Sequence, residues 1–270
     1  MNGKSPGKVF LIGAGPGDPG LLTIKAAKAI ASADVIVYDY LVNPEVLAHA
    51  RRGAELIFAG KRASEHSITQ EEINRLLIRR ARRGETIARV KGGDPFIFGR
   101  GGEEAEALVE AGIEWEVIPG ISSGVAAAAY AGIPLTHRGY SSSVAFITGH
   151  DAPGKEPIDW ATTAHAADTL VVFMCSESIS RIVRRLVENG RAISTPLAIV
   201  RWGTYEHQEV YSGTLEDLIS REDDSAFEIK PPAIAIIGEV VSLAGHLNWF
   251  GSAQLRHSLG SLSAITAVGE

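Results

Sequence analysis

This chain of 270 residues has one cysteine, no long apolar run and no excess of basic residues. Its one cysteine, Cys175, excludes an intrachain disulfide and fits a reducing compartment. No apolar stretch approaches the ~20 residues of a membrane span, and the N-terminal MNGKSPGK lacks the apolar core of a secretion signal. The formal net charge of −6 argues against a general nucleic-acid-binding protein. We therefore expect a soluble, cytoplasmic protein with no membrane and no nucleic-acid partner.

Hydrophobic residues make up 45% of the chain, which is enough for a substantial core. Up to residue 118, short β-rich segments such as VFLIG and DVIVYD alternate with helix-like segments such as LLTIKAAKAIASA. This alternation predicts a mostly parallel sheet covered by helices. A second set of segments follows, in which RWGTYEHQEVYSGT has the pattern of an antiparallel pair. We therefore expect an α/β protein whose second sheet is mixed.

The chain is predicted to contain two α/β domains. The first covers residues 8–118, and a small-residue segment at 119–139 forms the junction. The second covers residues 140–250, and residues 251–270 carry so little pattern that we expect a loose tail.

Two helix starts in the first domain have clear capping signals. Asn43 is a suitable N-cap before Pro44, so PEVLAHARR is predicted to be a helix that ends near Gly53. Thr69 and Glu72 have the spacing of a capping box before a second helix.

The glycine-rich segment GAGPGDPG follows the first predicted strand and raises the question of a dinucleotide site. An NAD-binding loop needs a third glycine where this chain has Asp18. Pro16 and Pro19 also restrict the chain and lack the N–H groups that hold a diphosphate. Asp39, at the end of the second predicted strand, still favours NAD. Open α/β sheets bind ligands at the carboxyl ends of their strands, so we expect this loop to bind a ligand, whether NAD or another molecule.

Two further loops of small residues follow predicted strands. They are RVKGGDPFIFGRGGEEAE at 89–106 and PGISSG at 119–124. Ser122 and Ser123 are suited either to cap a helix or to hydrogen-bond a ligand. Three such loops at one edge of a sheet predict a pocket lined largely by main chain, which suits a flat base with a short polar chain.

The segments GAGPGDPGLLT, ADVIVYDYLV, VKGGDPFIFGRGGEE, AAAAYAGIPLTHRG and TGH together resemble the tetrapyrrole methylases. The similarity runs in order from residue 8 to residue 250. It implies two α/β domains with the active-site cleft between them, usually in a homodimer. It also implies that S-adenosylmethionine (SAM) is the methyl donor. The motifs favour uroporphyrinogen III as the acceptor, methylated at C2 and C7 to give precorrin-2 for sirohaem and cobalamin synthesis.

Three alternatives remain open on the sequence. A later corrin-ring methylase would share the fold and act at another ring position. An NAD-dependent oxidoreductase would need the opening loop to hold a diphosphate. A binding module without catalysis is the last alternative, and the intact loops argue against it.

The resemblance carries a set of cofactor-binding residues onto this chain. The residues expected to bind SAM, or its product S-adenosylhomocysteine (SAH), are Pro16, Gly92, Gly93, Asp94, Ile97, Ser122, Ser123, Met174, Gly203, Thr204, Ala233 and Ala235. Cys175, Ser122 and Gly124 differ from the residues frequent in the family, but each difference is small.

Arg100 is the main catalytic candidate because it lies between glycines at a predicted helix start. A cation there is unfavourable unless a carboxylate compensates it, and either Glu103 or the substrate fits that role. The resemblance suggests proton removal or substrate anchoring, and we favour anchoring because arginine is a poor base. Pairing with Glu103 or Glu104 on the surface is the alternative. Asp39 is expected either to accept a pyrrole N–H or to form an Asx turn.

A substrate with eight carboxylates requires local basic residues on an acidic protein. We expect Lys61, Arg62 and His66 to bind its acidic arms, together with His137 and Arg138, although the last two are also suited to a role in the domain junction. The eight histidines show no metal-like spacing and one cysteine cannot form a thiolate site, so no metal is expected.

Overall fold

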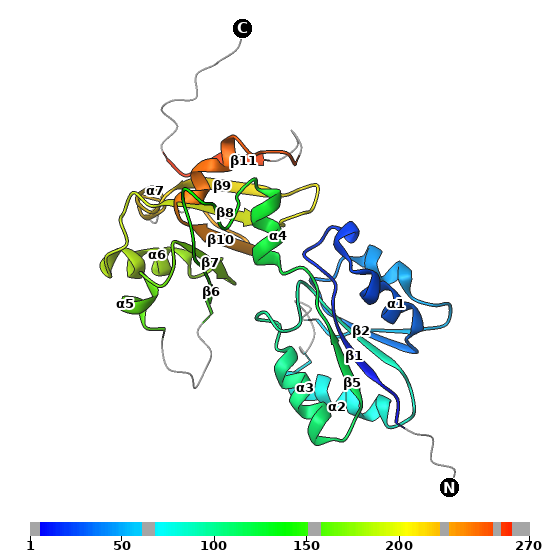
Figure 1. Cartoon of the computed structure of the whole chain (residues 1–270). Helices are drawn as coiled ribbons and strands as arrows, with labels where there is room; N and C mark the ends of the chain where they lie inside the picture. The colour runs from blue at the N-terminus through cyan, green and yellow to red at the C-terminus, as the bar shows by residue number, and fades with distance from the viewer. Residues whose placement is uncertain (1–5, 61–67, 151–157, 222–226, 251–254, 261–270) are drawn as a thin grey trace. The chain divides into compact units, whose positions relative to one another are not determined.

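The computed structural model describes residues 6–60, 68–150, 158–221, 227–250 and 255–260 (Figure 1). The chain divides into two compact units, Met1–Ser123 and Gly124–Glu270. This boundary lies inside the junction predicted at 119–139, and each unit contains one sheet.

The first unit contains a five-stranded sheet in the order β3-β2-β4-β1-β5. Its strands are β1 (Val9–Gly13), β2 (Val35–Tyr38), β3 (Glu55–Phe58), β4 (Ile87–Lys91) and β5 (Trp115–Ile118). Every neighbouring pair is parallel. The parallel sheet predicted from the strand–helix alternation is therefore confirmed.

Helices cover both faces of this sheet. The elements are α1 (Ile24–Ser32), α2 (Gln70–Ala81), α3 (Gly101–Glu110) and the 3₁₀ helices η1 (Pro19–Leu21) and η2 (Pro44–His49). Apolar residues of α2 and α3 pack on one face, and those of α1 and η2 pack on the other.

Both predicted helix starts are confirmed. The Thr69 hydroxyl accepts from the Glu72 N–H while the Glu72 carboxylate accepts from the Thr69 N–H. Asn43 caps the helix that begins at Pro44. That helix is 3₁₀ and ends at His49, so its predicted extent to Gly53 was wrong. The tighter 3₁₀ geometry is typical of short helical pieces.

The second unit contains a six-stranded sheet in the order β11-β9-β8-β10-β7-β6. Its strands are β6 (Val144–Thr148), β7 (Thr169–Phe173), β8 (Pro196–Arg201), β9 (Glu209–Thr214), β10 (Ala233–Ile237) and β11 (Leu255–Ser258). The pairs β6–β7 and β9–β11 are parallel, and the others are antiparallel. The mixed sheet is therefore confirmed.

Within the loose tail predicted for residues 251–270, the described residues include a strand, β11. Residues 255–258 pair with Glu209–Ser212 of β9. The Arg221 Nε atom also donates to the Leu259 carbonyl oxygen at 2.5 Å. A segment of four residues is too short to show a strand pattern. It forms a strand because the edge of β9 provides the hydrogen bonds.

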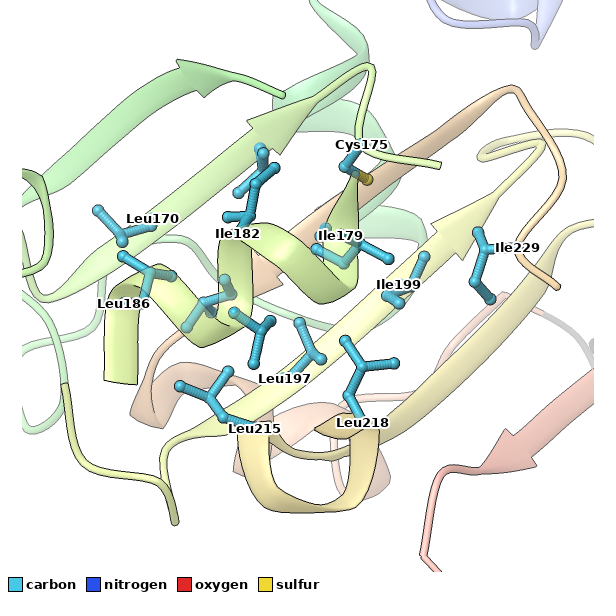
Figure 2. Close-up of a cluster of buried hydrophobic side chains, with 14 of the residues drawn as sticks. Leu170, Cys175, Ile179, Ile182, Leu186, Leu197, Ile199, Leu215, Leu218 and Ile229 are labelled. Atoms are coloured by element: carbon cyan, nitrogen blue, oxygen red, sulfur yellow. The ribbon is translucent and has the colours of Figure 1, made fainter. Parts of the chain in front are cut away.

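Helices also cover the second sheet on both faces. They are α4 (Ser123–Tyr130), α5 (Trp160–Thr163), α6 (Ile179–Glu188), α7 (Leu215–Ile219) and the 3₁₀ helix η3 (Glu239–Gly245). Figure 2 shows the core cluster to which α6 and α7 contribute, which includes Ile182 and Leu186 of α6 and Leu197 of β8. Across the described ranges, no helix has both the length and the apolar composition to span a bilayer.

Cys175 lies in this cluster and is fully buried (Figure 2). Burial raises the pKa of its thiol to about 12, so the reactive thiolate is scarce. We expect a disulfide reagent such as DTNB to leave the native protein unmodified at mildly alkaline pH. The same reagent should modify one thiol per chain in guanidinium. Fast stoichiometric reaction of the native protein would contradict this burial.

Candidate functional site

Three loops meet at one edge of the first sheet. Strand β1 lies between β4 and β5 and runs parallel to both, so the loops that follow these strands leave the same edge as neighbours. The Gly15 N–H donates to the Gly93 carbonyl oxygen at 3.1 Å, and the Gly93 N–H donates to the Gly15 carbonyl oxygen at 2.6 Å. Main-chain hydrogen bonds therefore join two of the loops in which we expected a ligand.

The third loop joins the others through close glycine packing. A Cβ atom on Gly13 would lie 2.4 Å from the Gly120 nitrogen and 2.6 Å from the Gly93 oxygen. A Cβ atom on Gly120 would lie 2.2 Å from the same oxygen. These distances exclude any side chain, so Gly13 and Gly120 are required by the approach of the main chains.

The Asp94 carboxylate holds this arrangement together. Its Oδ2 atom accepts from the Gly120 N–H at 3.0 Å, and its Oδ1 atom accepts from the Phe96 N–H at 2.8 Å. Both carboxylate oxygens thus have main-chain donors. Asp94 therefore stabilises the loops, independently of any contact with a ligand.

The other expected ligand residues of this unit lie around the same edge. Pro16 is half-buried, and the Ile97 side chain is exposed. Ser122 is partly exposed, and Ser123 begins α4. Together with Gly92, these positions offer main chain and small side chains to a ligand.

Left-handed backbone at residues other than glycine occurs, in the described chain, only in loops that follow strands of the two sheets. The residues and their φ angles are Phe98 (49°), Arg100 (57°), Met174 (52°), Trp202 (48°) and Thr204 (75°). Such strain persists only where the surroundings enforce it, and it concentrates at functional sites. Phe98 and Trp202 could not be predicted from the sequence, because neither residue type signals a positive φ.

Arg100 is the N-cap residue of α3 and pairs with Glu103. Its Nε and Nη2 atoms lie 2.9 Å and 2.7 Å from the two Glu103 oxygens. More than half of each side chain is exposed, at 57% and 52%. This hydrogen bonding raises the pKa of Arg100. Arg100 is therefore still less suited to act as the base that takes a proton from the substrate. The structure therefore contains the surface ion pair with Glu103 that we considered as the alternative. Anchoring of the substrate by Arg100 stays a prediction.

Asp39 directly follows β2, beside the loop of β4. Its Oδ1 atom accepts from the Leu41 N–H at 3.0 Å, which is the Asx turn we considered. Its Oδ2 atom makes no hydrogen bond within the described part of the chain. A Cβ atom on Gly92 would lie 2.6 Å from the Leu41 Cβ atom, so this turn packs against the glycine loop.

In the second unit, the expected ligand residues cluster at one edge of the sheet. Strands β7 and β8 both run antiparallel to β10, so their carboxyl ends meet where β10 begins. Met174 lies there half-exposed, and Ala233 begins β10. The Thr204 N–H donates to the Gln208 Oε1 atom at 2.8 Å.

Two small residues of this unit have close neighbours. A Cβ atom on Gly203 would lie 2.5 Å from the Ala127 Cβ atom. The Ala235 side chain is fully buried in the core, so only its main chain remains for the ligand contact we expected.

The substrate residues we expected are only partly described. Lys61, Arg62 and His66 lie outside the described residues. The His137 Nδ1 atom accepts from the Gly139 N–H at 3.1 Å, so His137 stabilises its own turn. Arg138 is exposed beside it. The described ranges contain no group of three or more histidine, cysteine, aspartate or glutamate residues arranged to hold a metal ion.

The sequence matches the family model of the tetrapyrrole (corrin/porphyrin) methylases over residues 8–219. The chain is 51% identical over 247 residues to the uroporphyrinogen-III C-methyltransferase of Bacillus subtilis, covering 91% of this chain and 95% of that protein. It is 49% identical over 261 residues to the siroheme synthase of Sodalis glossinidius, covering 95% of this chain and 55% of that protein. The chain therefore spans about half the length of the siroheme synthases that it matches.

A solved structure supports the same relationship. The uroporphyrin-III C-methyltransferase of Thermus thermophilus, complexed with S-adenosylhomocysteine, matches with a TM-score of 0.74 and 39% identity. The match covers 87% of this chain and 93% of that one. On the family match and these identities, the chain belongs to the tetrapyrrole methylases.

Proposed function

We propose that this protein is a SAM-dependent C-methyltransferase that converts uroporphyrinogen III to precorrin-2 by methylation at C2 and C7. The observation that carries the proposal is the close packing of three loops through the main chain of Gly13, Gly93 and Gly120 at the carboxyl edge of the first sheet. Loops joined in this way suit a compact donor, because the N–H groups of Gly15, Gly93 and Gly120 already have partners within the protein and leave no free run of N–H groups for a diphosphate.

The first unit contains residues that fit the cofactor. Gly92, Gly93 and Ser122 would contact it through main chain and small side chains, with Pro16 and Ile97 beside them. The motif resemblance adds further residues that we propose to contact the cofactor: Asp94, Ser123, Met174, Gly203, Thr204 and Ala233. SAM supplies an activated methyl group, so the protein is required mainly to align the reactants and exclude water.

The substrate would be held by charge and hydrogen bonding. The Arg100 guanidinium is a planar fork that matches a carboxylate, and its exposure leaves it accessible to an acidic arm. Binding there would exchange part of the Glu103 pair for the substrate. The Asp39 Oδ2 atom would accept a hydrogen bond from a pyrrole N–H.

Thermal shift with SAH and with NAD tests the proposed cofactor. A ligand at 100 times its dissociation constant stabilises the native state by about 2.7 kcal/mol. Each kcal/mol shifts Tm by about 2–4 °C for a domain of this size, so we expect SAH to raise Tm by about 5–10 °C. NAD should leave Tm unchanged. Stabilisation by NAD and not by SAH would favour the oxidoreductase.

We extend the proposal to a homodimer, as the motif resemblance implies, and to the cytoplasm, whose reducing conditions fit the single cysteine. Light scattering on a sizing column measures the mass directly. We expect twice the chain mass of 28.7 kDa, and a mass equal to one chain at micromolar concentration would contradict the dimer.

A further inference from the structure

A charged cluster lies buried between the first sheet and its helices. Arg89 and Lys91 of β4 and Glu104 of α3 are only 3%, 4% and 0% exposed. The Glu104 Oε1 atom accepts from the Arg89 Nε atom at 3.1 Å and from the Lys91 Nζ atom at 2.9 Å. It also accepts from the Gln70 Nε2 atom at 3.0 Å. One carboxylate oxygen thus joins three elements.

The position of this pair along the chain is informative. Lys91 is the last residue of β4, and Glu104 lies in the first turn of α3. The ion pair therefore closes the segment 92–103, which carries the left-handed residues Phe98 and Arg100. Strained backbone needs surrounding contacts that hold it, and a bond between the two ends of the loop is such a contact.

The charges of Arg89, Lys91 and Glu104 favour a role in positioning the loop over a role in stability alone. Burial raises the pKa of Glu104, but Arg89 and Lys91 outweigh that effect and hold the pKa below its usual value. Glu104 is therefore a buried carboxylate beside two cations. Its Oε2 atom is buried without a hydrogen-bond partner in the described chain. Apolar residues often give equal or greater stability than such a buried triad.

We propose that Lys91 and Glu104 are positioning residues whose buried ion pair holds the loop 92–103 in the conformation that binds the SAM cofactor. The inference rests on the proposed function. Because a preorganised loop loses less entropy on binding, breaking the pair should weaken SAH binding without removing a ligand contact.

The test uses the full chain with the Lys91→Met substitution. This change leaves Arg89 and Glu104 as a balanced pair, so we expect a Tm close to that of the wild type. The Kd for SAH, measured by calorimetry, should rise about tenfold, which corresponds to about 1.4 kcal/mol. Hydrogen exchange should accelerate in peptides of 92–103. Glu106→Gln is the matched control, because Glu106 is exposed on the same helix, and it should change neither quantity.

A triple variant keeps the inference testable if Lys91→Met fails to fold. Arg89→Met, Lys91→Met and Glu104→Leu together remove all three buried charges, and we expect a folded protein with the same tenfold loss of affinity. A folded variant that binds SAH as tightly as the wild type would overturn the positioning role. Failure of the wild type itself to bind SAH would instead overturn the proposed function.

Discussion

Gly120→Ala is expected to weaken SAH binding about 100-fold. The added Cβ atom would lie 2.2 Å from the Gly93 carbonyl oxygen and 2.7 Å from the Gly13 Cα atom. Both neighbours are main chain and cannot rotate away, so the loops must separate. Overpacking of this kind costs about 1–3 kcal/mol or more, and 2.7 kcal/mol corresponds to about 100-fold. Calorimetric titration with SAH measures the change.

Gly245→Ala is the control for Gly120→Ala. A Cβ atom on Gly245 meets nothing within 4 Å, and this glycine has no positive φ. We therefore expect Gly245→Ala to bind SAH as the wild type does, with an unchanged Tm. If folded Gly120→Ala binds SAH within threefold of the wild type, the cofactor does not bind at the edge where these three loops meet.

Arg100→Gly is expected to lower kcat/KM for uroporphyrinogen III about 100-fold while leaving the protein folded. Hydrogen bonds to charged groups contribute about 1.5–3 kcal/mol, which corresponds to about 10-fold to 150-fold in rate. The stability should hold because Arg100 has a φ of 57°, a conformation that glycine adopts without strain. The exposed pair with Glu103 adds little to stability. Initial rates and thermal melts measure the two effects.

Two further substitutions separate backbone from charge at this position. Arg100→Ala removes the same guanidinium but keeps a Cβ atom in left-handed backbone, so it should be about 1 kcal/mol less stable than Arg100→Gly with equal loss of activity. Arg100→Lys keeps the charge and loses the fork, so we expect intermediate turnover. Near-normal turnover of Arg100→Lys would remove recognition by the fork, and near-normal turnover of Arg100→Gly would remove Arg100 from the reaction altogether.

Much of the first unit follows from local sequence pattern. Strand–helix alternation predicts the parallel sheet, and parallel strands place the loops after β1, β4 and β5 at one edge. Glycine-rich segments at those strand ends are the basis for the ligand site that we propose there. The contacts of Asp94 with Gly120 and Phe96 could not be predicted, because they join residues that only the fold brings together.

Other features had weak sequence signals or none. The strand at 255–258 depends on the edge of β9, so its own four residues indicate nothing. The left-handed backbone of Phe98 is imposed by the loop around it. The buried cluster does have a sequence signal. Arg89 and Lys91 alternate with Ala88 and Val90 in a strand inside the sheet, where buried charges require a partner such as Glu104.

The identity and position of the methyl groups in the product test the proposed reaction most directly. The protein would be incubated with uroporphyrinogen III and SAM carrying an isotope-labelled methyl group, and the product analysed by mass spectrometry and NMR. We predict two labelled methyl groups, at C2 and C7. An unmethylated substrate, a third methyl group or label at another ring position would contradict the account.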